Sequence, residues 1–435
     1  MRGWGTLWVE LVALLLLSIF IVGGASRIPF HPDETSWLFQ SRDLEDLISD
    51  PSSLAFRSNV EPTQETTYRL LNAPLAKYVL GAARMAAGYP ASSVDSDWLW
   101  TKTWEDNVAA GALPDEGLLR AVRRASALLL IPAIIALYSC GRALGGRMTG
   151  LAAAALLATN ALVLLHGRRS MAEGALTLGI SLALLGLLHA DRHPWLAGLA
   201  AGLAFSAKTS AAVWIPLGWV AALWTSQPRR RSLGGALGRV GGFTLAAGLV
   251  VLVLHPILWA EPVSAVIEMW RARQALLAAQ VETTAQFMPW AVLWTPGDRI
   301  AGLLAHLYFS PLQFAEAGNY LRETAAAEAA YQAVPGNAMM RGILSGAPLL
   351  VMTLVGMIVA TRSGWSAGDA PRRAVALALL ATGVQAVALA VAVPLSFQRY
   401  SLPLVPLVCL WAGRGVAGLI EALKQSRRPV TRPTE

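Results

Sequence analysis

The stretch TLWVELVALLLLSIFIVGGA, residues 6–25, is apolar apart from one glutamate, Glu10, and two hydroxyl residues. A helix needs about 20 mostly apolar residues to cross a bilayer, and this stretch has that length. Comparable stretches recur along most of the chain, ending with residues 401–419. The sequence therefore predicts an all-α polytopic membrane protein.

The composition agrees with this prediction. Of the 435 residues, 55% are hydrophobic and 14% are charged, and the mean hydropathy is +0.49. An average globular chain carries about 25% charged residues, so a soluble domain is excluded. The two cysteines, Cys140 and Cys409, both lie inside apolar runs. They offer neither a disulfide framework nor a cysteine metal site.

The first apolar run has a second interpretation as a cleavable signal peptide, since Gly23, Gly24 and Ala25 form a weak small-residue cleavage pattern. We interpret it as a retained span. It is as long as a membrane span, and the densest polar motif of the chain follows it directly.

The net charge of +8 is unevenly distributed. Residues 27–117 hold 14 acidic and 7 basic residues, and residues 260–341 hold 7 acidic and 5 basic residues. Short loops rich in Lys and Arg mark the cytoplasmic side of a membrane, whereas long loops escape this rule. We therefore expect the two acidic segments to face outward, and both termini to lie in the cytoplasm.

This charge rule predicts about ten spans, within a range of about nine to 13. They are residues 6–26, 118–141, 148–166, 172–190, 195–207, 210–225, 236–258, 342–361, 374–393 and 400–420. The chain then divides into three parts. The first is a membrane module over residues 1–258, whose first outer loop, residues 27–117, carries interfacial helices. The second is an outer loop at residues 259–341, and the third consists of C-terminal helices with a basic cytoplasmic tail, residues 342–435. The inner loops are basic through Arg142, Arg147, Arg192, residues 229–231, Arg362, Arg372 and Arg373.

Two segments allow alternatives. Residues 70–87 are apolar on one face but carry Lys77 and Arg84, which favours an amphipathic interfacial helix over a span. If they did span, all later orientations would invert. Residues 195–224 carry Lys208 in the middle and have basic flanks, so they predict two short arms that turn at the outer surface.

The first outer loop opens with FHPDETSWLFQS, residues 30–41. Paired acids beside an apolar wall can be tuned as a general base or can bind a cation. The alternative is a plain helix start, because Pro32, Asp33 and Glu34 all suit a first turn. Residue types alone do not decide between the two.

Four further charged residues are candidates: Lys77 on the expected interfacial helix, and Glu173, Lys208 and Arg399 near predicted span ends. Lys77 and Arg399 could bind a lipid phosphate, or they could anchor the chain in the interface. Glu173 is at the start of an apolar segment, and Lys208 is the deepest charge in the chain. Each is therefore a candidate functional residue, and each needs a partner for its charge.

The order of these motifs resembles the GT-C superfamily of membrane glycosyltransferases, specifically the protein O-mannosyltransferase and lipid A aminoarabinose transferase families. Those enzymes follow a first span with an Asp-Glu pair, matched by Asp33 and Glu34. The later matching elements, in the family order, are residues 72–75 with Lys77; Arg123 with Ser126 and Ala127; the turn Gly141, Arg142, Leu144 and Gly146; Glu173; GLAFSAKT at 202–209; and RYSLP at 399–403.

The chain also departs from the aminoarabinose pattern. That family has Glu-Lys where this chain has Leu71 and Asn72, and an Arg where it has Ser36. Its fourth-span acid is more often Asp than Glu. These differences argue against the aminoarabinose activity itself.

The resemblance implies inverting transfer of a sugar from a polyprenyl-phosphate carrier to a hydroxyl of a protein, lipid or glycan at the outer face of the membrane. Phosphate is a good leaving group, so such a site needs cations and one base, without the acid of a glycosidase. The resemblance implies that Asp33 acts as the base, with Glu34 beside it. It implies that the carrier phosphate is bound by Lys77, Lys208 and Arg399. Supporting roles fall to Arg123, Glu173 and Tyr400. A divalent cation at Asp33, Glu34 or Glu173 stays open.

Two other functions stay open at this point. Intramembrane charges and a broken hairpin at Lys208 also fit a transporter or flippase of a lipid-linked or anionic substrate, although the sequence shows no internal repeat. A GT-C scaffold without activity is the third alternative. The composition, rich in Gly, Ala and Arg, suggests a bacterial plasma membrane protein of the cell envelope, and no feature suggests a nucleic-acid partner.

Overall fold

The computed structural model describes residues 2–225, 232–316, 318–339 and 341–427. Within these ranges the chain is helical, and the only β-pairing is an isolated bridge between Val292 and Leu395. The prediction of an all-α membrane protein is confirmed. The segment 229–231 and the tail beyond residue 427, both predicted to be cytoplasmic, lie outside the described residues.

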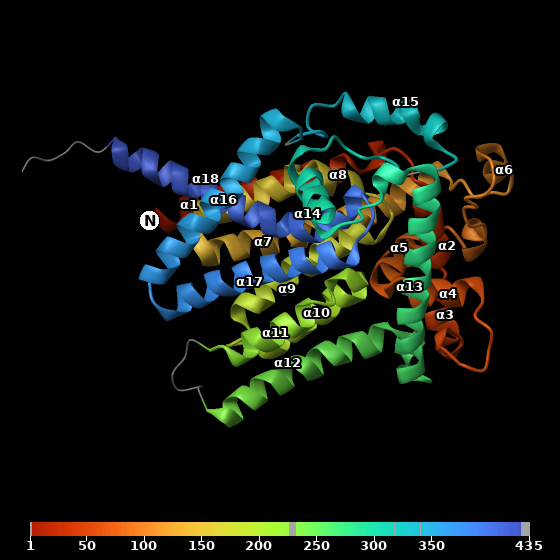
Figure 1. The fold of residues 1–435 in the computed structure, drawn as a ribbon, viewed down its shortest axis with the longest axis horizontal. Helices are drawn as coiled ribbons and strands as arrows, with labels where there is room; N and C mark the ends of the chain where they lie inside the picture. The colour runs from red at the N-terminus through yellow and green to blue at the C-terminus, as the bar shows by residue number, and fades with distance from the viewer. Residues whose placement is uncertain (1, 226–231, 317, 340, 428–435) are drawn as a thin grey trace, which may run out of the picture.

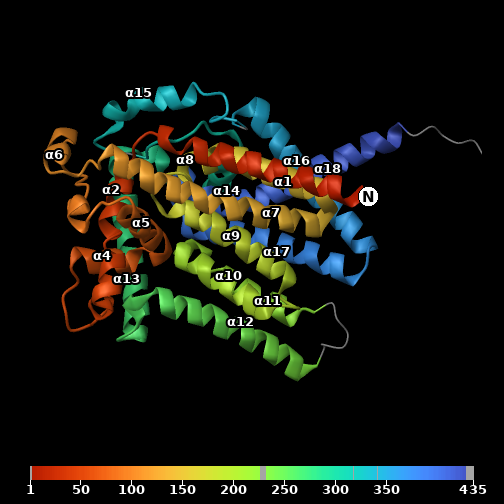
Figure 2. The same ribbon diagram turned by 180° about the vertical axis from the view of Figure 1, so that it is seen from behind.

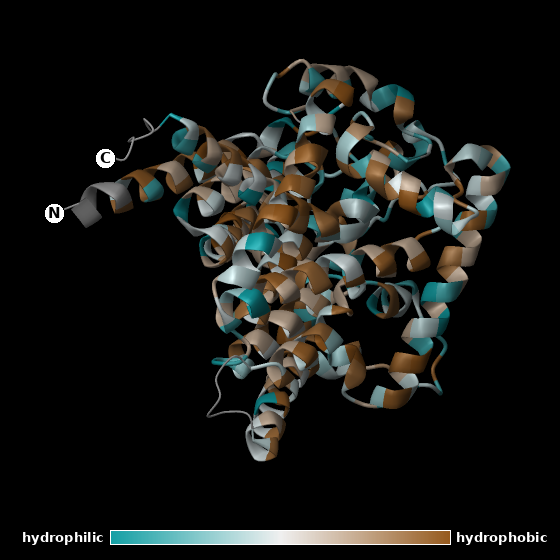
Figure 3. Ribbon diagram, turned by 60° about the vertical axis from the view of Figure 1, so that its left-hand side comes forward, coloured by the Kyte–Doolittle hydropathy of each residue, from teal (hydrophilic) through white to brown (hydrophobic). Residues whose placement is uncertain are grey.

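Seven helices in the described ranges are long and apolar enough to cross a membrane. They are α1 (Arg2–Gly23), α7 (Glu116–Thr159), α9 (Ala172–His189), α12 (Leu233–Leu254), α16 (Ile343–Ser366), α17 (Asp369–Ala392) and α18 (Val405–Ser426), the last preceded by the 3-10 helix η9 (Gln398–Leu404). They run roughly along one direction in a bundle (Figure 1). Hydrophobic residues dominate these helices (Figure 3). The count of ten spans stays a prediction.

The helix α7 contains the predicted span 118–141 and most of the predicted span 148–166, which ends in α8 (Ala161–His166). Its backbone leaves the helical region at Gly145 and Gly146, and Gly146 has a φ of +80°. A Cβ atom on Gly141 would lie 2.7 Å from the Cα atom of Gly150. In a continuous helix these residues would be about 13.5 Å apart along the axis, so the chain reverses between them. The two halves of α7 therefore form a tight antiparallel hairpin that closes on two glycines.

Both ambiguous segments have short helices. Residues 70–87 fall on α4 (Gln64–Leu71) and α5 (Pro74–Ala86). At 1.5 Å per residue, α5 reaches only about 20 Å, which is too short to cross a bilayer. The segment around Lys208 breaks as predicted: α10 (Pro194–Ala207) ends there, Lys208 is extended, and α11 (Trp214–Leu223) follows.

Most of the other helices gather at one end of the bundle, which we call the loop end. These are α2 (Pro32–Gln40), α3 (Asp43–Ser49), α4, α5, α6 (Trp104–Ala109), α8 (Ala161–His166), α13 (Pro262–Phe287), α14 (Pro296–Leu304) and α15 (Leu321–Gln332). The helix α13 crosses the loop end almost perpendicular to the bundle in both views (Figures 1 and 2). The start of α1 and the end of α18 lie at the opposite end.

At that opposite end the glutamate of the first span is neutralised by basic residues. Glu10 is buried in α1, and its carboxylate pairs with Arg147 at 2.8 Å. It also accepts a hydrogen bond from the Tyr138 hydroxyl. An ionisable group inside a span needs such partners. Together with the packing of Ile21 and Ala25 in the core, they fasten α1 to α7 as part of the bundle.

We expect Gly141→Ala to destabilise the protein, because the added methyl group would overlap the backbone of Gly150. Overpacking of this kind typically costs about 1–3 kcal/mol. Thermal unfolding of the protein in detergent measures the loss. The matched control is Gly248→Ala in α12, where a Cβ meets nothing within 4 Å. Equal melting temperatures for the two variants would contradict the hairpin.

Candidate active site

The Asp-Glu pair lies in the first turn of α2. His31 is the N-cap: its Nδ1 accepts the Asp33 N–H at 3.1 Å, and the Glu34 carboxylate accepts the His31 N–H at 3.2 Å. Pro32 occupies the first helical position, where its missing N–H costs nothing. The plain helix-start interpretation is therefore correct for the backbone. It does not account for what the two carboxylates contact.

Glu34 is locked into the interior. Its side chain is fully buried, and Arg123 of α7 binds both carboxylate oxygens, at 2.8 and 2.5 Å. The N–H and the hydroxyl of Ser170 also donate to it, at 3.0 and 2.9 Å. Although burial alone would raise the pKa of Glu34, Arg123 and these donors lower it to about 2. Glu34 is therefore ionised at neutral pH and holds α2 against α7.

Asp33 faces a different environment on the same turn. Its side chain is 22% exposed and forms an ion pair with Arg399 of η9. Burial would raise the pKa of Asp33, but the positive charge of Arg399 keeps it below its ordinary value. The carboxylate is therefore ionised at neutral pH, and it is the more accessible acid of the pair.

Arg399 and His31 are joined by a residue of the second long loop. Glu316 pairs with Nε of Arg399 at 3.0 Å and with Nε2 of His31 at 2.9 Å. Because Nδ1 of His31 accepts from the backbone, its Nε2 is the nitrogen that carries the proton toward Glu316. Burial opposes ionisation of Glu316, yet Arg399 and His31 keep its pKa well below the ordinary range.

A second cation, Lys208, lies near the same tyrosine ring as Arg399. Lys208, at the break between α10 and α11, pairs with Glu173 at the start of α9, at 2.6 Å. Its Nζ is 5.8 Å from the centre of the Tyr400 ring, and Cζ of Arg399 is 5.6 Å from the same ring. The predicted residues from α2, α7, α9, α10 and η9 are thus brought together at the loop end.

Lys77 belongs to another cluster. It is 1% exposed and binds Asp43 at 3.2 Å, and Asp43 also accepts from Arg69 at 2.8 Å. Burial lowers the pKa of Lys77, while Asp43 opposes this effect. The structure therefore places Lys77 beside Asp43 rather than in contact with Asp33 or Arg399.

The three acids named for a cation do not form one site. Each pairs with its own basic residue: Asp33 with Arg399, Glu34 with Arg123, and Glu173 with Lys208. In the part of the chain that the structure describes, no group of three His, Cys, Asp or Glu side chains could hold a metal ion. This arrangement does not fit a bound divalent cation, and we derive no chemistry from one.

Sequence reasoning did not select His31, Glu316 or Ser170. His31 directly precedes the Asp-Glu pair, so its capping role could have been found from position. Glu316 lies in a loop between helices and is 285 residues away from His31. No local pattern indicates it, because only the folding of the second loop over α2 gives it partners.

The fold and site define a polytopic α-helical membrane protein with a charged site at one end of its bundle. Residues 115–259, one third of the chain, match the family of dolichyl-phosphate-mannose-protein mannosyltransferases. None of the curated proteins compared with the chain matches its sequence significantly.

The chain is similar in fold to solved structures of the archaeal oligosaccharyltransferase AglB from Archaeoglobus fulgidus, a GT-C superfamily member. The complex of that protein with an inhibitory peptide and a dolichol-phosphate has a TM-score of 0.53 at 11% identity, covering 99% of this chain and 53% of that one. The apo form has a TM-score of 0.54 at 12% identity, covering 99% and 54%. A complex with Zn and sulfate has a TM-score of 0.51 at 12% identity, covering 95% and 50%.

The chain thus spans about half the length of the solved structures that it resembles. The resemblance to the GT-C superfamily is confirmed by this fold and by the mannosyltransferase match. Both findings support an integral membrane protein of the GT-C glycosyltransferase class.

We expect Arg123→Leu to destabilise the fold by about 3–5 kcal/mol, because it leaves Glu34 buried without its partner. The pH dependence follows from the Glu34 pKa of about 2, below its ordinary 4.5. The stabilisation is complete above pH 4.5 and is lost as the pH falls from 4.5 toward 2. Thermal unfolding against pH measures both effects. Glu34→Gln should remove this pH-dependent part, and parallel curves for Glu34→Gln and wild type would contradict the assignment.

Proposed function

We propose that the protein is an inverting membrane glycosyltransferase. It transfers a sugar from a polyprenyl-phosphate carrier to a hydroxyl acceptor at the outer face of the membrane. The observation that carries this proposal is one partly exposed carboxylate, Asp33, in contact with Arg399, with both Arg399 and Lys208 within 6 Å of the centre of the Tyr400 ring. The family match, described for dolichyl-phosphate-mannose, and the AglB complex with a dolichol-phosphate support a lipid-phosphate donor.

The residues suit an in-line displacement. Asp33 takes the proton of the acceptor hydroxyl as the acceptor oxygen forms its bond to the anomeric carbon. The bond from that carbon to the phosphate oxygen breaks on the opposite face, and its electron pair stays on the polyprenyl phosphate. Arg399 and Lys208 stabilise the charge that develops there, and the planar guanidinium of Arg399 suits two phosphate oxygens.

The donor also changes the strength of the base. Without a donor, the guanidinium of Arg399 holds the pKa of Asp33 low and makes it a weak proton acceptor. A phosphate that binds Arg399 competes for this guanidinium, so the Asp33 carboxylate loses part of its partner. Its pKa then rises and it becomes a better base. Glu316 keeps a second contact on Arg399 and so limits how far the guanidinium can move.

The orientation follows from the loops. The loop end carries the two long acidic segments, and the other end carries the basic turns with Arg142 and Arg372. The positive-inside rule supports the orientation that we propose, with Asp33 at the periplasmic or external face of a bacterial plasma membrane and both termini in the cytoplasm. Lys77 stays a candidate phosphate ligand in its own cluster with Asp43.

We expect Asp33→Asn to lower the transfer rate by about 10²–10⁴-fold, the usual contribution of a general base. The assay measures release of polyprenyl phosphate from a panel of polyprenyl-phosphate sugars by purified protein in nanodiscs. Glu323→Gln, which removes an exposed acid of α15, is the control and should leave the rate unchanged. Full activity of Asp33→Asn in a folded protein would sink the assignment of the base.

Arg399→Gln should raise the KM for the donor by about tenfold or more, since a charge-assisted phosphate contact is lost. It should also shift the acid limb of kcat/KM to higher pH. Arg399 lowers the pKa of Asp33, and without it burial raises that pKa, so the base becomes protonated sooner as the pH falls. Arg322→Gln, which removes an exposed arginine of α15, is the matched control. An acid limb of kcat/KM that is unchanged in Arg399→Gln would contradict the claim that Arg399 sets the pKa of Asp33.

A further inference from the structure

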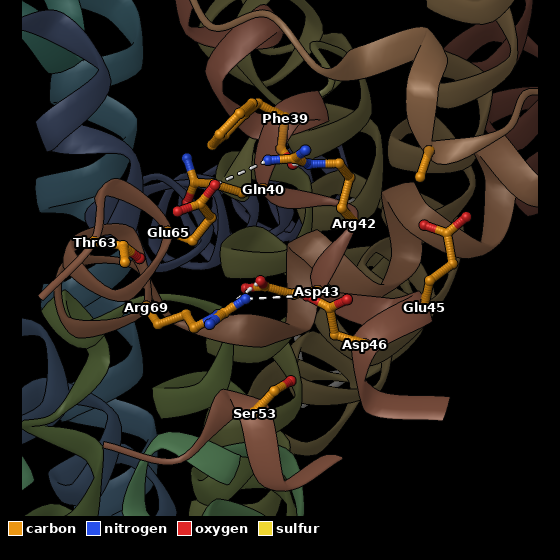
Figure 4. A pocket seen from close by; sticks show the side chains of 11 residues that line it. Phe39, Gln40, Arg42, Asp43, Glu45, Asp46, Ser53, Thr63, Glu65 and Arg69 are labelled. Atoms are coloured by element: carbon orange, nitrogen blue, oxygen red, sulfur yellow. Dashed lines mark hydrogen bonds and ion pairs between the residues drawn. The ribbon is translucent and has the colours of Figure 1, made fainter. Parts of the chain in front are cut away.

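The first outer loop encloses a cavity that the proposed chemistry does not use. Its volume is about 430 Å³, within the range of ligand pockets, and it is partly open. It lies where the C-terminal end of α2 meets α3 and α4, and its lining side chains point toward a common space (Figure 4). Nine of its eleven lining residues are polar or charged.

Two arginines fix its walls. Arg42 binds Glu65 at 3.3 Å and Asp95 at 3.0 Å. Arg69 binds Asp43 at 2.8 Å and Asp46 at 3.1 Å. Figure 4 shows Arg42 reaching Glu65 and Arg69 reaching both aspartates. Since each arginine is shared between two acids, the carboxylates keep free lone pairs that can accept hydrogen bonds from a ligand.

The charge of the lining disfavours an anionic ligand, although Lys77 and Arg84 outside the lining also pair with Asp43 and Glu45. Four carboxylates, those of Asp43, Glu45, Asp46 and Glu65, face the space against two guanidinium groups. The side chains of Asp46 and Glu65 are 46% and 40% exposed, so both are accessible from the opening. A lipid phosphate would be repelled here, whereas neutral hydroxyl groups can donate to these acids and accept from the arginines.

The lining also argues against an apolar ligand. Phe39 is the one aromatic residue among the lining residues, and the guanidinium of Arg42 covers its ring at 4.0 Å. The other apolar residue is Ala91. A peptide segment would need a surface for its apolar side chains, and this cavity provides little. Hydroxyl-rich saccharides match polar walls of this kind.

The position connects the cavity to the base. Gln40 lines the cavity, and Asp33 lies seven residues earlier on the same helix. This spacing puts both on one face of α2, about 10 Å apart along its axis. Between them, Ser36 donates to Asp97 at 2.7 Å, and Asp97 also accepts from Gln64 of α4 at 2.7 Å. Polar groups therefore continue from the base to the cavity.

We propose that this cavity is an acceptor subsite for a neutral, hydroxyl-rich saccharide whose reacting hydroxyl reaches Asp33. The inference rests on the proposed glycosyltransferase function and specifies its acceptor as a glycan. The ion pairs of Arg42 and Arg69 set the shape of the subsite, and its acidic excess selects neutral chains over anionic ones.

The test uses the full-length protein in nanodiscs with a polyprenyl-phosphate sugar that it cleaves. The acceptor probes are fluorescently labelled neutral tetrasaccharides of glucose, mannose and N-acetylglucosamine, and labelled tetragalacturonate as the anionic probe. Ser53→Trp fills the cavity without breaking an ion pair, because the Ser53 hydroxyl bonds only the Asp50 carbonyl. Ser49→Trp places the same bulk on an exposed residue that does not line the cavity.

We expect Ser53→Trp to raise the KM for the neutral acceptor at least tenfold, with Ser49→Trp unchanged. Cleavage of the donor by water, measured without acceptor, should be the same in both variants, which shows an intact base. Asp46→Asn should raise the KM for the neutral acceptor and improve the relative use of tetragalacturonate, because one repelling charge is gone.

Three results would overturn the proposal: an unchanged acceptor KM in Ser53→Trp, equal use of neutral and anionic probes by wild type, or transfer only to peptide hydroxyls. Failure of the proposed function is a different outcome. In that case wild type does not cleave any donor, with or without an acceptor.

Discussion

The ion pair between Asp33 and Arg399 joins an early and a late segment of the chain at the site. Asp33 lies just after the first span, and Arg399 lies just before the last helix. A carboxylate at this depth is stable only beside a cation, and a guanidinium that is 13% exposed needs an anion. Glu316 joins the same arginine from the second long loop. The two long acidic segments and the start of the last helix are therefore held together by the ion pairs of Arg399 with Asp33 and Glu316.

The two neighbouring acids of the motif, Asp33 and Glu34, differ in burial and in the number of partners that bind them. Glu34 points inward, where Arg123 and Ser170 use both of its oxygens. Asp33 is 22% exposed and has one arginine, Arg399, which it shares with Glu316. Successive helical residues project about 100° apart, so adjacent positions meet different walls. This separation lets one carboxylate serve the structure and leaves the other available for chemistry.

Much of the architecture could be predicted from the composition and from the lengths of the apolar runs. Apolar runs predicted the long helices, Gly145 and Gly146 lie where the prediction placed a turn, and Lys208 marked the break before α11. The predicted site residues Asp33, Arg399, Lys208 and Glu173 are near one another, since each follows or precedes a span at the loop end. Lys77, expected to bind the same phosphate as Lys208 and Arg399, lies instead beside Asp43, because sequence order cannot tell which acid a buried lysine will meet.

The sequence by itself determined the membrane fold, the end of the bundle that carries charge, and the motif order that resembles GT-C enzymes. A spanning helix needs a run of apolar residues, and placing a charged residue in lipid costs free energy. Both constraints act on neighbouring residues, so the spans and their ends can be recognised in the sequence. Only the tertiary structure decided the partners: Glu316 with Arg399 and His31, Arg123 with Glu34, and the cavity between α2 and α4. These contacts join segments far apart in the chain, and side-chain pairing across such distances depends on how the helices pack.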